Sequence, residues 1–457
     1  MAPTRAHNDK FESMAMAPAQ ISTTWVDVTD ISDWQGAPTG IQRVVHEWGQ
    51  RVLQLPGPTK CCRFDPKVGA FVPASESALR DPFDPHCEST LRTSDLLTAR
   101  PSPPRSRFSR LQHRLNNRLR NRLGNRLGNR LGNRLGSDPG PMRAVTPFAP
   151  GDRLVIIGAN WLTPGYAHHL HHVANEKSLE ITQVVYDLIP SMYPQWAARG
   201  AASIVTPFLV QVLPLCKRIV CISQNTRNDV EQFVIANSLS LRSDVSVEVV
   251  RLGTASAAAS AHDVATPPQE IDPDAPFVLC VGTLEVRKNQ IVLYQAYCEA
   301  ARRGIQLPTL YCVGRIGWLA ESTEHAIRND PAVNAHIQIL ESIHDNQLEW
   351  LYRNCMMTVY PSLYEGWGLP VAESLAHGKI CITTTQSSLP EVGGALADYA
   401  SPFCSNEWLD ALAKYLDPAT RTTRESEIQV AYQPRTWDTS GQEFCISIRN
   451  TDEARSL

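Results

Sequence analysis

Buried strands alternate with amphipathic helices twice along this chain of 457 residues, and this alternation constrains the fold most. The first set holds "TWVDVTDI", "DRLVIIGANWL", "ITQVVYDLIP" and "RIVCIS", and the second holds "FVLCVG", "TLYCVG", "HIQIL", "MMTVYPS" and "KICITT". Strands that alternate with helices form parallel sheets covered by helices on both faces. The chain is also too long for one compact core. We therefore predict an α/β fold with two Rossmann-like domains facing across a cleft.

Changes in composition mark the expected domain borders. Residues 253–276 are rich in Ala, Pro and Asp, which is typical of a linker. From about 81 to 150 the chain is rich in Pro, Ser and Arg and lacks apolar periodicity, which predicts a disordered basic insertion. The expected units are a disordered leader (1–22), an N-terminal Rossmann-like domain that contains the insertion (23–252), the linker (253–276), a C-terminal Rossmann-like domain (277–420) and a C-terminal helix (421–457) that packs back on the first domain.

Positive charge is concentrated inside that insertion. Residues 96–137 carry eleven arginines and no acid, which leaves the rest of the chain at −14 against an overall net charge of −3. The repeat "NRLGNRLGNRLGNRLG" would stack leucines on one helical stripe, but each glycine costs about 1 kcal/mol relative to alanine. Two interpretations stay open: a slipped repeat tolerated in a loop, and peripheral contact of the 100–136 tract with an anionic membrane. No aromatic residue interleaves the arginines after Phe108, so we expect no nucleic-acid partner.

Cysteine usage and hydropathy indicate the compartment. The twelve cysteines include no CxxC pair, and several lie in apolar runs as small buried hydrophobes. The leader lacks the apolar region of a signal peptide, and no window reaches the roughly 18 apolar residues of a membrane span. We expect a cytoplasmic protein, with a peripheral position at the inner face of the membrane as the alternative.

The stretch "YPSLYEGWGLPVAESLAHG" holds two glutamates around a glycine-rich turn that follows a predicted strand. Gly366 and Gly368 allow close backbone approach to a ligand, and Pro370 suits the first turn of a helix. Free N–H groups at that helix start suit a diphosphate. We predict that Glu365 and Glu373 each accept hydrogen bonds from a polyol group, with phosphate between them. The alternative is a surface helix with two solvated acids.

The stretch "VGTLEVRKNQ" places two cations at the start of another helix. Arg287 and Lys288 follow a predicted strand, and a helix is expected from about Asn289. Cations at a helix N-terminus are unfavourable with the helix dipole unless an anion lies nearby. The pair therefore predicts a site for a leaving diphosphate.

The pair "GTLEVRKN" and "EGWGLPVAE" resembles family 4 of the retaining glycosyltransferases, which have the two-domain GT-B fold. "VVYDLIPSMYP", "CISQNTRNDV" and "VVRLG" are similar to that family's N-domain and hinge text. "DVTDISDWQGAPTGIQRVV" resembles a bacterial, mannosyltransferase-like subgroup with a "TGIQRVV" opening. The resemblance covers roughly residues 25–75 and 150–440. It implies transfer of a hexose from a nucleotide sugar with retained anomeric configuration.

The resemblance also implies roles for single residues. Glu365 matches the glutamate that contacts the donor sugar, Glu373 the one that binds the ribose, and Arg287 with Lys288 the pair that stabilises the leaving diphosphate. Asp187 is a further catalytic candidate, with capping of the turn in "YDLIP" as the alternative. Many relatives have a histidine where this chain has Tyr186, so an acid/base role there is doubtful. The remaining donor-binding candidates are Thr39, Gly40, Gly366, Trp367, Gly368 and Leu369.

We expect a hexosyltransferase of surface polysaccharide biosynthesis that acts on a glycan or lipid-linked glycan, with mannose from GDP-mannose as donor by resemblance only. No metal or other cofactor is expected, since "IDPDAP" is interpreted as a turn and His168 and His172 as a helix surface. The base pocket is expected near Arg315 and Ile343. The alternatives are a non-catalytic scaffold of the same fold and a nucleotide-sugar epimerase of related fold.

Overall fold

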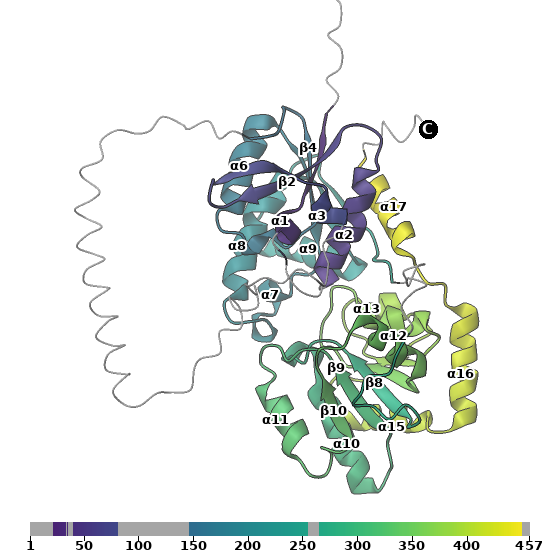
Figure 1. The fold of residues 1–457 in the computed structure, drawn as a ribbon. Helices are drawn as coiled ribbons and strands as arrows, with labels where there is room; N and C mark the ends of the chain where they lie inside the picture. The colour runs from purple at the N-terminus through teal and green to yellow at the C-terminus, as the bar shows by residue number, and fades with distance from the viewer. Residues whose placement is uncertain (1–21, 33, 35–39, 81–145, 255–264, 450–457) are drawn as a thin grey trace, which may run out of the picture.

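The computed structural model describes residues 22–32, 34, 40–80, 146–254 and 265–449. The chain forms two α/β domains, each with its own mainly parallel sheet, as the alternation predicts (Figure 1). Thr39, nearly all of the predicted leader, and the whole arginine-rich repeat lie outside the described residues.

The first domain is built on seven strands in the order β3-β2-β1-β4-β5-β6-β7. All neighbours pair in parallel except β2 and β3, which form an antiparallel hairpin. The strands are β1 (Thr24–Asp27), β2 (Thr59–Asp65), β3 (Ala70–Ala74), β4 (Arg153–Ile156), β5 (Glu180–Val185), β6 (Cys216–Cys221) and β7 (Ser246–Val249). The helices are α1 (Thr29–Ser32), α2 (Gly40–Leu53), α3 (Ser77–Arg80), η1 (Asn160–Leu162), α6 (Tyr166–Lys177), α7 (Ile189–Met192), η2 (Pro194–Trp196), α8 (Ala201–Val212), η3 (Leu213–Leu215) and α9 (Gln224–Ala236).

The second domain is built on six parallel strands in the order β10-β9-β8-β11-β12-β13. Its central strands are buried on both faces because helices cover both sides of the sheet. The strands are β8 (Phe277–Val281), β9 (Thr309–Val313), β10 (Ile337–Leu340), β11 (Met357–Tyr360), β12 (Cys381–Thr383) and β13 (Asp398–Tyr399). The helices are η4 (Val286–Lys288), α10 (Gln290–Arg303), α11 (Glu321–Asn329), α12 (Asp345–Asn354), α13 (Leu369–Ala376), α14 (Leu389–Gly393) and α15 (Ser405–Lys414).

The described part of the C-terminal region holds two helices, where the expectation was one C-terminal helix over 421–457 that packs back on the first domain. The first, α16 (Pro418–Ala431), places Ile428 in the core of the second domain. The chain is extended around Pro434, because proline lacks the N–H that a continuous helix would need. The second helix, α17 (Trp437–Ser447), packs against α2 of the first domain (Figure 1).

The described chain resumes at Thr146, a few residues before the expected end of the insertion at about 150. Phe148 is buried, and its ring centroid lies 5.5 Å from that of Trp25. The backbone N–H of Ala149 donates to the Asp152 carboxylate at 2.8 Å. Residues 146–150 therefore belong to the first domain. Among the described residues, no helix has the length and apolar character needed to cross a membrane.

Candidate active site

The site lies where β8 and β11, neighbours in the second sheet, end at the same edge. β8 leads into η4, which carries Arg287 and Lys288, and β11 leads into the loop that carries Glu365. Nζ of Lys288 lies 2.7 Å from Oε1 of Glu365, and Nη1 of Arg287 lies 2.7 Å from Oε2. The fold therefore brings together three of the predicted residues from segments about 77 positions apart.

The charges of this cluster shape one another. Burial alone would raise the pKa of Glu365, but Arg287 and Lys288 lower that pKa from 4.5 to about 2. Burial lowers the pKa of the Lys288 ammonium, and the charge of Glu365 opposes that shift. The carboxylate is thus ionised and bound to both cations, so the two cations enter any reaction with a fixed geometry.

Three further residues complete the cluster, and the sequence analysis did not identify them. The Glu285 carboxylate, buried in the same loop, accepts from Nη2 of Arg287 at 2.7 Å. The Tyr360 hydroxyl donates to Oε1 of Glu365 at 2.9 Å, and its ring lies under the Lys288 ammonium. The Ser387 hydroxyl accepts from the backbone N–H of Glu365 at 2.8 Å. Glu285 and Tyr360 lie inside the two quoted motifs, but spacing alone did not indicate which way their side chains point.

Glu373 has partners of its own, one turn into α13. The Tyr352 hydroxyl donates to Oε2 of Glu373 at 2.8 Å. Nη1 of Arg43, on α2 of the first domain, lies 3.7 Å from Oε1. One oxygen of Glu373 is therefore oriented by its own domain, and the other faces a cation of the opposite domain.

The predicted glycine turn lies against the first domain. A Cβ on Gly366 would lie 2.1 Å from the backbone oxygen of Tyr186, and a Cβ on Gly368 would lie 2.8 Å from Cδ2 of Leu389. Trp367 is buried in the same apolar cluster as residues of α2, and Leu369 packs against that cluster. A Cβ on Gly40 would lie 3.7 Å from Cδ1 of Leu369. In this structure protein atoms occupy the space beside Gly366, where the sequence suggested approach of a ligand.

Asp187 is half-buried beside the cluster, two residues after the end of β5. Burial raises the pKa of its carboxyl, and the charge of Arg287 opposes this shift. The carboxylate accepts from the backbone N–H of Ile189 at 3.0 Å, which is the turn capping weighed as the alternative. The Tyr186 hydroxyl donates to the backbone oxygen of Ile157 at 2.9 Å, inside the core of the first domain.

The other candidates lie elsewhere. His168 and His172 are exposed on α6, and the described residues contain no group of three or more His, Cys, Asp or Glu placed to hold a metal ion. In "IDPDAP" the Asp272 carboxylate accepts from the backbone N–H of Asp274 at 3.1 Å, which is a turn. Arg315 is exposed after β9, and Ile343 is half-buried after β10.

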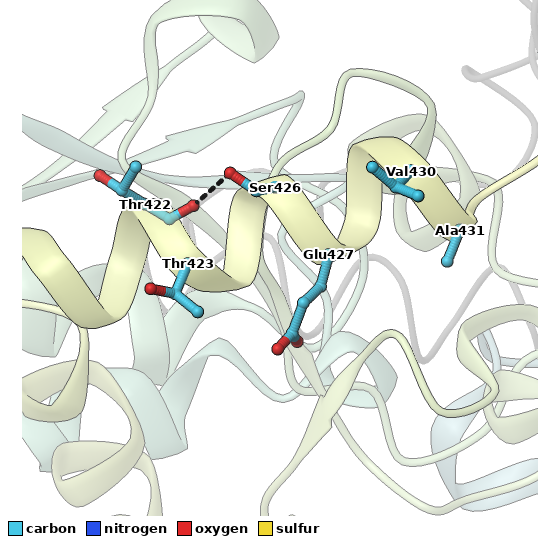
Figure 2. Close-up of a pocket in the computed structure, with 6 residues that line it drawn as sticks. All are labelled: Thr422, Thr423, Ser426, Glu427, Val430 and Ala431. Carbon is cyan, nitrogen blue, oxygen red and sulfur yellow. Dashed lines mark hydrogen bonds between the residues drawn. The ribbon is translucent and has the colours of Figure 1, made fainter.

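Figure 2 shows a shallow hollow along α16, where the Ser426 hydroxyl donates to the Thr422 backbone oxygen at 2.8 Å. This hollow contains none of the site residues.

Residues 264–417 match the model of the family described as "Glycosyl transferases group 1". Serotype-specific mannosyltransferase WbdA of Escherichia coli is 28% identical over 204 residues, which are 42% of this chain and 24% of that protein. O-antigen chain mannosyltransferase B of Escherichia coli is 34% identical over 130 residues, 28% of this chain and 33% of that protein. The matches thus span about a quarter to a third of the length of these relatives.

Among solved structures, sucrose-phosphate synthase from Thermosynechococcus elongatus is similar over 95% of this chain and 100% of that chain, with a TM-score of 0.57 and 15% identity. At this level of identity the likeness concerns the fold. The arrangement of the two parallel-sheet domains is the GT-B fold.

Proposed function

The second domain carries the group 1 glycosyl transferase signature within a GT-B fold, and from this we propose that the protein is a retaining hexosyltransferase. It transfers a hexose from a nucleotide sugar to a glycan or lipid-linked glycan in surface polysaccharide biosynthesis. The matched relatives are both named mannosyltransferases, and one is named for the O-antigen chain, which supports mannose as the sugar. GDP-mannose is the donor that the resemblance implies.

One observation carries the proposal: a buried carboxylate pairs with two partly buried cations at the carboxyl edge of a parallel sheet. Ligands of such sheets bind at this edge. Arg287 and Lys288 stabilise the negative charge that develops on the leaving diphosphate. Glu365 keeps both cations in place and accepts a hydrogen bond from a hydroxyl of the donor sugar. The transition state resembles an oxocarbenium ion.

Other residues bind the rest of the donor. Glu373, oriented by Tyr352, accepts hydrogen bonds from the ribose hydroxyls. The start of α13 provides backbone N–H groups for phosphate, and Thr39 and Gly40 are the donor-binding residues of the first domain. Asp187 lies beside the reacting centre. The two cations and the helix ends neutralise the diphosphate, and the reaction proceeds without a metal ion.

The first test is a thermal-shift panel with GDP, UDP and ADP, each with and without an attached sugar. We expect one nucleotide to stabilise the wild type by about 2.7 kcal/mol at a concentration of 100 times Kd. Glu373→Ala should lose affinity for the nucleotide more than for inorganic phosphate. Equal losses of affinity for the nucleotide and for phosphate would exclude a role of Glu373 in binding the ribose. No thermal shift with any nucleotide would contradict donor binding.

The second test is hexosyl transfer by Lys288→Ala. Turnover should fall at least about tenfold, which corresponds to about 1.4 kcal/mol of lost transition-state stabilisation. Lys414→Ala is the matched control, because Lys414 also pairs with a carboxylate, at 2.9 Å, and also lies over a tyrosine ring, but on α15. Wild-type turnover in Lys288→Ala would exclude the leaving-group role. Nucleotide binding without transfer would favour the scaffold alternative.

A further inference from the structure

Glu365 lies in the segment 364–366, and side chains of the second domain bind the backbone of this segment. Nη1 of Arg287 donates to the backbone oxygen of Tyr364 at 2.6 Å. The Ser388 hydroxyl donates to the backbone oxygen of Glu365 at 3.0 Å. The same guanidinium therefore binds both the Glu365 carboxylate and the peptide in front of it.

The first domain binds the same three residues through the start of α9. The Tyr364 hydroxyl donates to Oδ1 of Asp229 at 2.7 Å and accepts from Nδ2 of Asn225 at 3.0 Å. The Thr226 hydroxyl lies 3.3 Å from the backbone oxygen of Gly366, to which it donates. Asp229 and Thr226 are buried, so water competes little for these contacts. The segment is thus held between the two domains.

The start of α9 is anchored to the second domain a second time, independently of Tyr364. The Glu391 carboxylate, on α14, accepts from the backbone N–H of Gln224 at 2.8 Å and from that of Asn225 at 2.7 Å. These groups belong to the first turn of α9, where N–H groups lack partners within the helix. Asp229 is therefore presented to Tyr364 from a helix whose position is already fixed.

We propose that Tyr364 is a positioning residue. Its hydroxyl, bound by Asp229 across the domain boundary, fixes the backbone of residues 364–366, and this backbone holds the Glu365 carboxylate against Arg287. Tyr364 acts through these two residues and needs no contact with the substrate. The cations are then correctly arranged for transfer only while the two domains are in contact. The expected effect of Tyr364 on transfer rests on the proposed function. Its expected effect on the backbone of residues 364–366 does not.

Kinetics of Tyr364→Phe, Asp229→Ala and the double variant test the catalytic consequence. Each single variant should lower kcat about tenfold, the effect of losing one hydrogen bond to a charged group, with the donor KM unchanged within about twofold. The double variant should be no slower than the singles, because both remove the same contact. Asp229→Asn should restore most of kcat, since its amide oxygen still accepts from the tyrosine. The control is Tyr294→Phe, which removes a similar bond, 2.8 Å long, to Asp330.

Hydrogen exchange of the backbone amides of residues 362–368 in the unliganded protein tests the structural consequence. Exchange should be faster in Tyr364→Phe and Asp229→Ala than in the wild type and in Tyr294→Phe. Unchanged exchange, or kcat losses that multiply in the double variant, would overturn the inference. A wild type that transfers no sugar would defeat the proposed function alone, because the exchange rates still decide whether the Tyr364–Asp229 contact holds this segment.

Discussion

Glu365 is a buried carboxylate that would be costly to ionise without its two cationic neighbours. Replacing a buried ion pair with apolar residues is often neutral for stability, so such a cluster is weak evidence for a purely structural role. Removing a single partner of such a pair, by contrast, leaves a buried charge without compensation. At this site, removal of the Glu365 carboxylate leaves one positive charge of Arg287 and Lys288 uncompensated, and an anionic ligand could compensate it.

Glu365→Gln tests this reasoning at the residue scale. The amide keeps the shape of the side chain but leaves the cluster with one uncompensated positive charge, because Glu285 still pairs with Arg287, so the unfolding free energy of the second domain should fall by about 3 kcal/mol. The same excess charge should tighten the binding of inorganic pyrophosphate. Urea unfolding and calorimetric titration measure the two effects. In the control Glu231→Gln, whose pair with Arg227 is exposed, stability should change by less than about 1 kcal/mol. Weaker pyrophosphate binding in Glu365→Gln would contradict an anion site.

The stability contributed by Glu365 should also depend on pH. Its pKa is about 2 in the folded protein against an ordinary 4.5, so the folded state favours the ionised form. The contribution, about 3 kcal/mol, is present above pH 4.5 and is lost as the pH falls from 4.5 toward 2. The stability difference between the wild type and Glu365→Gln should therefore shrink between pH 5 and pH 3. A constant difference across that range would contradict the lowered pKa.

At the scale of elements, the sequence predicted the parts that hydrophobic periodicity controls. The expected strands "FVLCVG" and "TLYCVG" are β8 and β9. β7 was not predicted, because it is a half-buried strand at the sheet edge that reads "SVEV" and lacks an apolar run. The space beside Gly366 also could not be predicted, because it is filled by the backbone of a residue 180 positions away, and local pattern carries no information about such a contact.

The helix α17 is the element whose placement local sequence controls least, because it follows α16 in sequence yet completes the core of the other domain. The rings of Trp48 and Phe444 stack with centroids 4.3 Å apart, and both side chains are fully buried. The Trp48 indole N–H also donates to the Ser440 hydroxyl at 3.0 Å. The first domain is therefore incomplete without residues 437–447.

Phe444→Ala should lower the unfolding free energy of the first domain by about 3–5 kcal/mol, the cost of a cavity left by a buried aromatic ring. Tryptophan fluorescence during urea unfolding measures this loss through the change in the surroundings of Trp48. The matched control is Phe403→Ala, because Phe403 is 81% exposed and its removal opens no cavity. If only the second domain lost stability in Phe444→Ala, the packing of α17 on α2 would be contradicted.

At the scale of the whole molecule, the described chain leaves the first domain after Thr254 and returns to it between α16 and α17, and the described residues at these two crossings lie side by side. The backbone N–H of Thr254 donates to the backbone oxygen of Arg435 at 2.9 Å, and Gly253 lies against the backbone of Trp437. The domains also touch away from these crossings, where the Trp318 indole N–H donates to the backbone oxygen of Trp196 at 2.9 Å. Adjacent crossings allow one domain to turn on the other, and the remaining contacts hold the pair together.

Gly366→Ala tests how closely the domains must approach. The added Cβ would lie 2.1 Å from the backbone oxygen of Tyr186. Because a Cβ has no rotamer that could move it away and the oxygen belongs to the backbone, the contact is relieved most readily by separation of the domains. We expect a larger radius of gyration by small-angle X-ray scattering, and faster amide exchange at the start of α9, where Glu391 binds across the boundary. The radius should be unchanged in Gly40→Ala, whose Cβ would meet only Cδ1 of Leu369, at 3.7 Å. A wild-type radius and wild-type exchange in Gly366→Ala would mean that the loop of Tyr186 yields, and that this glycine does not control the approach of the two domains.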